Sequence, residues 1–434
     1  MTSSTRLYLP DNIRPMHIYI PGKTRHGKST LLFWMALQDI QRGQGVCVMD
    51  AKGDLVQKLI HFIPKNRVED TLYLDIQTPV PLDLMGYLKE PPKLALLEKQ
   101  AIIGELKYLL MKTVEPQHAP VMTQNLTDVL YTLLNANENT AIPPSRKTTF
   151  LDLYWFLENP RRREEVLSYC TDQDLLRRWR DDMPNHLEIS RITSRMTPFV
   201  RSGSLRAIFG APEPKLNITS VMNERKVLLV NLGPCDEIQR AYGTLLISKI
   251  RQAAYRRAYI PPSKRTPFYL YCDEFQEFQT SDFDKMLSMA GGFGLCLTLA
   301  HQFTEQLQPP IRESIMGNVS TFICFRVGHQ SANCLKGEIP KQYADYLITL
   351  PVGRVLYRAA DGSTRFITTP NPPLFAGRDS YADTIRKRTS EIYACNTPQE
   401  SYSPSSESNA AASAPEETTS PKALPPHKRA FRRP

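Results

Sequence analysis

A short segment near the start of the chain has the residue types and spacing of a phosphate-binding loop. Residues 22–29, "GKTRHGKS", match the pattern GxxxxGK[ST]. Glycines at both ends of such a loop let the backbone turn tightly, so that the loop N–H groups and the next helix N-terminus point at phosphate oxygens. The pattern predicts ATP or GTP, bound with Mg²⁺ by Gly22, Lys23, Thr24, Arg25, His26, Gly27, Lys28, Ser29 and Thr30. Lys28 is expected on the β- and γ-phosphates and Ser29 on Mg²⁺.

A second set of polar residues follows two apolar runs further along the chain. "FYLYCDEF" is predicted to be a buried strand ending at Asp273 and Glu274. In nucleotide hydrolases such a strand end holds Mg²⁺ and orients the attacking water. Asp273 is therefore assigned to the metal and Glu274 to catalysis. "LCLTLAHQ" ends the next strand at Gln302, where an amide can sense the γ-phosphate or orient water. The alternative is that all three are solvated polar ends of strands.

The elements around these residues predict a parallel sheet. Strand 16–20, the glycine loop, helix 29–42 and strand 45–50 form a βαβ unit. Within the last part of this unit, "DAKGD" at residues 50–54 is read most simply as a tight glycine turn. Further apolar runs predict strands at 71–76, 226–233, 267–274, 295–302 and 319–328, and a hairpin over 353–369 that turns at Asp361-Gly362.

Residues between the third and fourth strands change to helical spacing. We therefore predict an α/β fold, a mostly parallel P-loop (RecA-like) sheet with an inserted all-α domain and a disordered C-terminal tail. The expected ATPase core is discontinuous, covering residues 1–90 and 222–375. The inserted helical domain covers 91–221, a C-terminal extension covers 376–395, and the tail at 396–434 is too poor in large apolar groups to order.

Composition narrows the class of protein. The chain has 434 residues, of which 41% are hydrophobic and 23% charged, which is ordinary for a soluble protein. Its net charge of +10 favours polyanions such as nucleic acid, although part of that charge lies in the basic C-terminus.

The 8 cysteines include no CxxC pair and several occur in apolar runs, so we expect buried thiols in a reduced protein rather than a zinc site. No apolar run approaches the ~18 residues of a membrane helix, and no signal peptide begins the chain, so a cytoplasmic location is expected.

The order of these motifs resembles the HerA–FtsK superfamily of P-loop ATPases. The closest likeness is to its coupling-protein branch in conjugation and type IV secretion, the TraG/TraD-like group. That group carries a glycine loop, a DxKGD element, an NPLD-like element, inserted helices, a DE strand, a strand ending in Gln and an FRV strand. The matching segments here, within residues 16–370, are "GKTRHGKST", "DAKGD", "VPLDL", "YCDEFQEF", "LAHQ" and "FRVG".

The resemblance implies an ATP hydrolase that works as a hexameric ring, with each active site between subunits. Such rings pump DNA or deliver nucleoprotein to a secretion channel, and the helical insertion helps to engage the substrate. DNA is thus the expected partner, together with further copies of this chain and secretion-channel or relaxosome proteins. Two alternatives remain: a motor of the same fold that acts on protein substrates, and a nucleotide-switched adaptor with weak hydrolysis.

This chain departs from the family pattern in two respects. Coupling proteins usually carry N-terminal membrane helices, whereas the loop here begins at Gly22, so docking at the inner membrane would need a partner protein. The family also commonly has an arginine before the strand of Gln302, in an "RKxG" turn that reaches the neighbouring subunit's nucleotide. Gly291 occupies that position. The arginines that could replace it are Arg326 in "FICFRVG", and in reserve Arg201 and Arg206.

Overall fold

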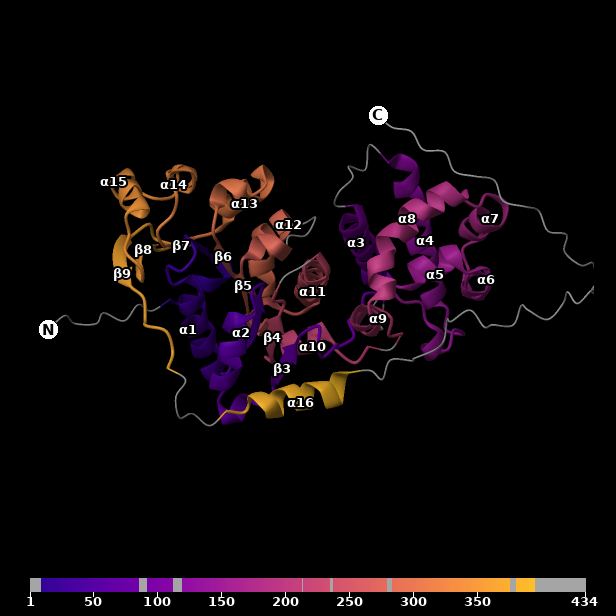
Figure 1. Ribbon diagram of the computed structural model, residues 1–434, viewed down its shortest axis with the longest axis horizontal. Helices are drawn as coiled ribbons and strands as arrows, with labels where there is room; N and C mark the ends of the chain where they lie inside the picture. The colour runs from indigo at the N-terminus through magenta and orange to yellow at the C-terminus, as the bar shows by residue number, and fades with distance from the viewer. Residues whose placement is uncertain are drawn as a thin grey trace, which may run out of the picture. The chain divides into compact units, whose positions relative to one another are not determined.

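A mixed sheet is the main element of the computed structural model, which describes residues 9–85, 92–111, 119–212, 214–234, 237–278, 283–374 and 380–394. Within these residues the sheet has the strand order β3-β4-β2-β5-β6-β1-β7-β8-β9 (Figure 1). Its strands are β1 Ile18–Pro21, β2 Gly45–Asp50, β3 Thr71–Leu74, β4 Val227–Asn231, β5 Phe268–Asp273, β6 Leu295–His301, β7 Thr321–Cys324, β8 Arg354–Arg358 and β9 Thr364–Thr368.

All neighbouring strands from β3 to β7 run parallel, and β8 and β9 add an antiparallel edge. The predicted α/β class with a mostly parallel sheet is therefore confirmed. The hairpin is confirmed as well, because Arg358 pairs with Thr364 across a turn in which Gly362 has a φ of 82°. The predicted disorder of residues 396–434 lies outside the described residues.

The two faces of the sheet are buried in separate apolar cores, which is why its strands read as continuous apolar runs. Along β2, Val46 and Val48 enter one core while Cys47 and Met49 enter the other. The first face is covered by α1 Lys28–Gln41, α2 Asp54–Leu59 and α16 Ala382–Tyr393. The second is covered by α11 Glu237–Arg256, α12 Phe283–Met289 and α13 Pro309–Asn318. Two short helices near β7 complete this part, α14 His329–Leu335 and α15 Lys341–Ala344.

Among the described residues, the segment between β3 and β4 is mainly helical, as the change of sequence period predicts. Figure 1 shows most of these helices gathered in one bundle. They are α3 Pro92–Met111, α4 Pro120–Glu138, α5 Asp152–Glu158, α6 Pro160–Tyr169, α7 Gln173–Asp181, α8 His186–Arg201, α9 Gly203–Phe209 and α10 Ile218–Asn223. The helices from α6 to α10 each start at a side chain that accepts backbone N–H groups of the first turn: Asn159, Asp172, Asn185, Ser202 and Asn217.

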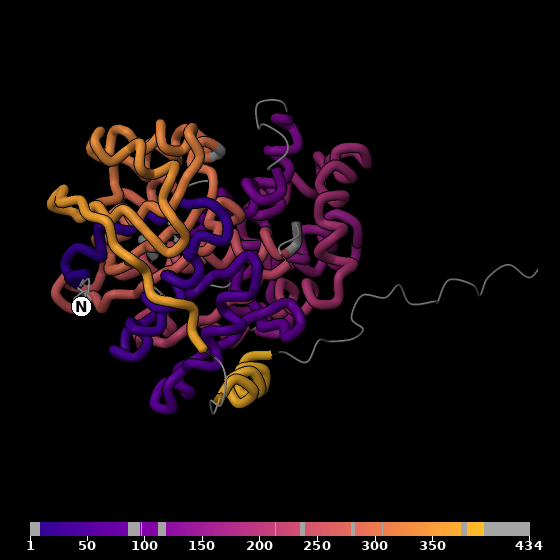
Figure 2. Tube along the Cα trace, turned by 60° about the vertical axis from the view of Figure 1, so that its left-hand side comes forward, coloured from indigo at the N-terminus to yellow at the C-terminus, as the bar shows by residue number. Residues whose placement is uncertain are grey.

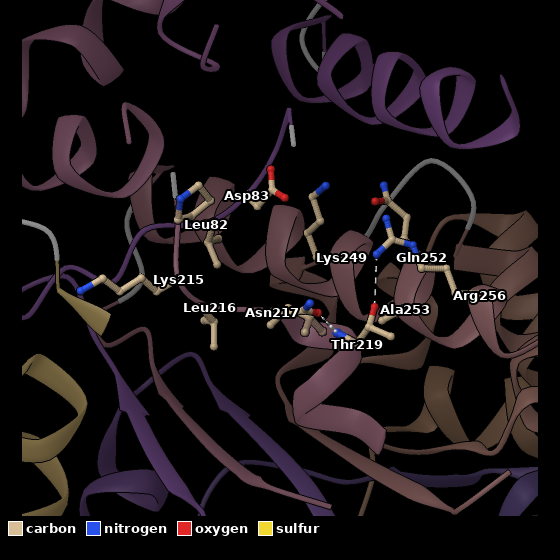
Figure 3. A pocket seen from close by; sticks show the side chains of 12 residues that line it. Leu82, Asp83, Lys215, Leu216, Asn217, Thr219, Lys249, Gln252, Ala253 and Arg256 are labelled. Carbon is tan, nitrogen blue, oxygen red and sulfur yellow. Dashed lines mark hydrogen bonds between the residues drawn. The ribbon is translucent and has the colours of Figure 1, made fainter. Parts of the chain in front are cut away.

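Helix α11 joins this helical segment to the sheet. In α11, Nη2 of the buried Arg251 lies 2.6 Å from Oε1 of Glu105 in α3. Arg256 of α11 also forms an ion pair with Glu98 of α3. Beside α11, a pocket of about 220 Å³ is lined by Lys249, Gln252 and Arg256, together with residues of α10 and of the strand-like segment at 82–83 (Figure 3). None of the predicted nucleotide-site residues lines this pocket.

The chain after β9 returns to the first face of the sheet. The indole N–H of Trp34 in α1 donates to the carbonyl oxygen of Asn371 at 2.8 Å, so the segment after β9 passes alongside α1 (Figure 2). Helix α16 then packs on β3, where the Tyr73 N–H donates to Thr389 Oγ1 at 3.1 Å and the Arg386 guanidinium lies over the Tyr73 ring. Helix α16 thus lies against the edge strand of the sheet.

Candidate nucleotide site

The predicted phosphate loop connects β1 to α1, and both of its glycines are required by the packing. A Cβ on Gly22 would lie 2.4 Å from Cβ of Phe325, which follows β7. Gly27 has a φ of 110°, in the left-handed region that favours glycine, and it precedes the first residue of α1. The loop therefore turns sharply between two buried elements, with the N-terminus of a 14-residue helix at its end.

Lys28 is buried within this loop. Its ammonium donates to the carbonyl oxygen of Gly22 at 2.6 Å and to that of Lys23 at 3.2 Å. Burial lowers the pKa of Lys28, while the negative charges of Glu274 and Asp273 act in the opposite direction. The loop carbonyls of Gly22 and Lys23 thus hold the cation inside the turn.

Ser29 and Asp273 meet at the carboxyl end of β5. The Ser29 hydroxyl donates to Asp273 Oδ2 at 2.5 Å, and Asp273 Oδ1 is buried without a hydrogen-bond partner. Burial raises the pKa of Asp273 to about 6, and the nearby charges of Asp50 and Glu274 add to this effect despite the Ser29 hydrogen bond. A buried carboxylate oxygen without a donor, beside a hydroxyl, is a pair of hard oxygen ligands and fits Mg²⁺.

Glu274 follows β5 in a strained conformation. Its φ is 53°, which is uncommon for a residue with a side chain, and only 3% of the residue is exposed. Its carboxylate Oε1 accepts from Lys52 Nζ at 2.6 Å and also from the amide of Gln302. Burial alone would raise the pKa of Glu274, but the hydrogen bonds from Lys52 and Gln302, together with the positive charges of Lys52 and Lys28, lower the pKa.

Gln302 connects the glutamate to the loop. Its Nε2 donates to Glu274, and its Oε1 accepts from the hydroxyl of Thr24 at 2.6 Å. The contact follows from strand order, because β6 pairs with β1 and the Gly22 N–H donates to the His301 carbonyl oxygen at 3.0 Å. The three strand ends at β1, β5 and β6 thus bring the predicted loop, acidic pair and glutamine into one cluster.

Comparison with known proteins bears on the fold that carries this cluster. No protein-family model matches the chain, and no curated protein matches it. Among solved structures, the plasmid coupling protein TrwB in complex with a non-hydrolysable ATP analogue superposes with a TM-score of 0.61 at 13% identity, over 86% of this chain and 89% of that chain. TrwB in complex with ADP and Mg²⁺ gives a TM-score of 0.59 at 14% identity, over 86% and 89%.

A further solved structure matches, VirB4 of Thermoanaerobacter pseudethanolicus, with a TM-score of 0.54 at 15% identity, over 82% of this chain and 90% of that chain. The chain has a TrwB-like fold. The resemblance found in the motifs is therefore confirmed at the level of the fold. In the described part of the chain, no helix has the length and apolar character needed to cross a bilayer.

Two residues outside the predicted site belong to the cluster in this TrwB-like fold. Asp50, at the end of β2, accepts from the N–H groups of Lys52, Leu55 and Val56 and so fixes the turn into α2. Gly53 has a φ of 85°, which agrees with the interpretation of "DAKGD" as a glycine turn. The Lys52 side chain on Glu274 was not predicted, because 222 residues separate the two.

The cluster opens into a pocket of about 260 Å³. Helix α1 contributes Thr30 and Phe33, and the segment after β9 contributes Pro372 and Pro373. Ser29, Asp50, Lys52, Asp54, Leu55, Lys58 and Asp273 complete the lining. The pocket therefore joins the Ser29–Asp273 pair to an apolar wall formed by distant parts of the chain.

The packing of the Pro15 backbone in this chain explains why position 291 carries no side chain. A Cβ on Gly291 would lie 2.1 Å from the carbonyl oxygen of Pro15. Arg326 lies beside the loop of its own chain: its carbonyl oxygen accepts from the Lys23 N–H at 2.7 Å, and its Nε donates to the Ile348 carbonyl oxygen at 2.9 Å. Arg201 and Arg206 are exposed on the helical segment, in α8 and α9.

Proposed function

We propose that the protein is a Mg²⁺-dependent ATP hydrolase. The observation that carries this proposal is the hydrogen bond between Ser29 and Asp273, with the unpartnered Asp273 Oδ1 beside it and Glu274 next in sequence. A P-loop hydrolase needs a hydroxyl and a carboxylate on the metal and a further polar group that orients water. The TrwB structures with an ATP analogue, and with ADP and Mg²⁺, share the fold.

In this proposal the loop from Gly22 to Thr30 binds phosphates through its N–H groups, and Lys28 moves from the loop carbonyls to the β- and γ-phosphates. Ser29 and Asp273 hold Mg²⁺, which when bound neutralises phosphate charge. Glu274 orients and activates the attacking water. Gln302, already bonded to Thr24 and Glu274, links the phosphate loop to that carboxylate.

We further infer that hydrolysis drives a motor of the coupling-protein type that moves DNA or nucleoprotein. The net charge of +10 and the likeness to a conjugative coupling protein support a DNA substrate. The working form is a homo-oligomer, with a hexameric ring as the expected state. Secretion-channel or relaxosome proteins are the further partners, and one of them would place the protein at the inner membrane.

The proposed division of the chain follows from the sheet. Strands β3 and β4 are parallel neighbours, so the helices from α3 to α10 form one long connection between adjacent strands. This supports an ATPase core of residues 1–90 and 222–375 with a helical domain at 91–221. Residues 376–395 form the extension that contains α16.

Two other functions have support in specific observations. The fold is shared with VirB4 as well as with the coupling protein TrwB, so the first alternative is a motor of the same fold that acts on protein substrates. The Lys52 contact on Glu274 and the lack of a side chain at position 291 favour a slow, nucleotide-switched adaptor.

Turnover assays with and without DNA separate these functions. DNA stimulation supports the DNA motor, and binding that falls about 10³–10⁵-fold between 50 and 200 mM salt would match about 6–10 phosphate contacts. Turnover without any DNA effect favours the protein-substrate motor, and nucleotide binding without turnover favours the adaptor.

A further inference from the structure

The carboxylate of Glu274 accepts three hydrogen bonds in this structure. Lys52 and Gln302 both donate to Oε1, and Gln276 Nε2 donates to Oε2 at 3.2 Å. A carboxylate only accepts hydrogen bonds, and each donor uses a lone pair that an attacking water would need. The arrangement therefore suits a resting site better than a hydrolysing one.

Lys52 differs from the other two donors in its exposure and its charge. Its side chain is 49% exposed, whereas the Glu274 side chain is 4% exposed. Its ammonium reaches over the buried carboxylate from the pocket that Ser29 and Asp273 also line. A lysine is a point charge on a flexible stem, so it can exchange one anion for another nearby.

The fold of the turn does not depend on the Lys52 ammonium. The backbone N–H groups of Lys52, Leu55 and Val56 donate to Asp50, at 2.9, 2.7 and 3.1 Å. Gly53 supplies the left-handed conformation that the turn requires. The Lys52 amine is therefore available to respond to a ligand without loss of local structure.

We propose that Lys52 is a positioning residue that holds Glu274 in the resting state and passes to the terminal phosphate of a bound nucleoside triphosphate. The transfer leaves Glu274 free to face the attacking water. A nucleoside diphosphate lacks that phosphate, so Lys52 stays on Glu274 when the diphosphate is bound. This inference rests on the proposed function, and it makes the contact a sensor of the third phosphate.

The test compares the affinities of two nucleotides in the full-length protein. Dissociation constants for ADP and for the non-hydrolysable ATP analogue AMPPNP are measured with Mg²⁺ by titration calorimetry. Lys52→Met is expected to raise the dissociation constant of AMPPNP by at least about 5-fold and to leave that of ADP within about 2-fold of the wild-type value. Lys52→Arg keeps a cation and is expected to restore part of the AMPPNP preference.

The second arm uses Glu274→Gln, in which Lys52 no longer has to leave a carboxylate. AMPPNP is expected to bind about 5-fold or more tightly than to the wild type, with ADP unchanged. In the Glu274→Gln background, Lys52→Met should then weaken AMPPNP more than it does in the wild type. This reciprocity follows because one cation is shared between two anions.

Lys58→Met is the matched control, because Lys58 lines the same pocket and, in the part of the chain that the structure describes, donates no hydrogen bond to Glu274. It should leave the ratio of AMPPNP to ADP affinity unchanged. The proposal is overturned if Lys52→Met weakens both nucleotides equally, if Lys58→Met has the same effect, or if Glu274→Gln leaves AMPPNP affinity unaltered. Failure of the wild type to bind either nucleotide would overturn the proposed function itself, and the sensor with it.

Discussion

Ser29 Oγ lies 2.5 Å from Asp273 Oδ2, although 244 residues separate the two in the chain. Strands β1 and β5 are not neighbours, since β6 lies between them and pairs with both. The carboxyl ends of parallel strands meet at one edge of a sheet, where ligands of α/β proteins bind. The site is therefore a product of strand order, and variants that disturb β6 should disturb metal binding.

Asp273→Asn should stabilise the protein in the absence of nucleotide at neutral pH. Because the pKa of Asp273 is raised from 3.8 to about 6, its contribution to stability is full below pH 3.8 and is lost as pH rises through about 6. The Asn side chain cannot ionise, so the variant does not lose this stability. Its free energy of unfolding should exceed that of the wild type by about 1–3 kcal/mol at pH 7.5 and by much less at pH 4. Urea denaturation at the two pH values measures the difference.

The exposed Asp361, whose pKa is lowered, provides the control. Asp361→Asn should not stabilise the protein at pH 7.5. Adding Mg²⁺ and ATP should reverse the order for Asp273→Asn, because the wild type gains ligand stabilisation that the variant lacks. Equal stability of wild type and Asp273→Asn at pH 7.5 would show that the carboxylate is not strained in the folded protein.

Alanine substitutions at two glycines should have opposite effects on stability. Gly22→Ala places a Cβ 2.4 Å from Phe325 Cβ and should cost about 1–3 kcal/mol. Gly104 lies within α3, and a Cβ there would meet no atom within 4 Å beyond the local helix backbone, so Gly104→Ala should raise the free energy of unfolding by about 0.5–1 kcal/mol. Guanidinium denaturation curves decide this, and a stable Gly22→Ala protein would contradict the packing of the loop on Phe325.

Arg326→Ala tests the arginine that would act on a neighbouring subunit. The variant should bind ATP normally and lose most of its hydrolysis, because an arginine supplied in trans is worth ~10³–10⁵ in rate in other P-loop enzymes. Mixtures with Lys28→Ala subunits should show interdependence between neighbours. Steady-state turnover and ATP titration measure the two effects.

Arg354→Ala is the control for that experiment, since Arg354 is an exposed arginine on the adjacent strand β8. It should retain turnover. If Arg326→Ala, Arg201→Ala and Arg206→Ala all hydrolyse ATP at the wild-type rate, none of them replaces the family arginine. A slow wild type would then agree with the empty position at Gly291.

Glu105→Ala should destabilise the junction between α3 and α11. The side chains of Arg251 and Glu105 are 4% and 3% exposed, and removing one partner leaves a buried charge, at a cost of about 3–5 kcal/mol. Glu391→Ala breaks an exposed pair with Lys387 in α16 and should change stability by less than about 1 kcal/mol. If both variants lose similar amounts of free energy of unfolding, the buried pair of Arg251 and Glu105 does not stabilise the junction more than an exposed pair does.

The local sequence pattern was sufficient to predict the bounds of an element where that element is buried on both faces. Residues 45–50 were predicted as a strand and form β2 with the same bounds, because an apolar run between glycine and aspartate permits little else. The pattern did not delimit α11, since Thr244, Ser248 and Arg251 are polar yet buried and blur its apolar period. The Lys52–Glu274 contact was missed because strand order, rather than local pattern, creates it.

ATP turnover by wild type and Glu274→Gln, measured side by side with Mg²⁺ and with or without DNA, tests the proposed function most directly. The wild type should hydrolyse ATP and be stimulated by DNA. Glu274→Gln should bind ATP at least as well as the wild type and hydrolyse it at least ~10²-fold more slowly. Full turnover by Glu274→Gln, or no turnover by the wild type under any of these conditions, would contradict the assignment of this cluster as an ATP-hydrolysing site.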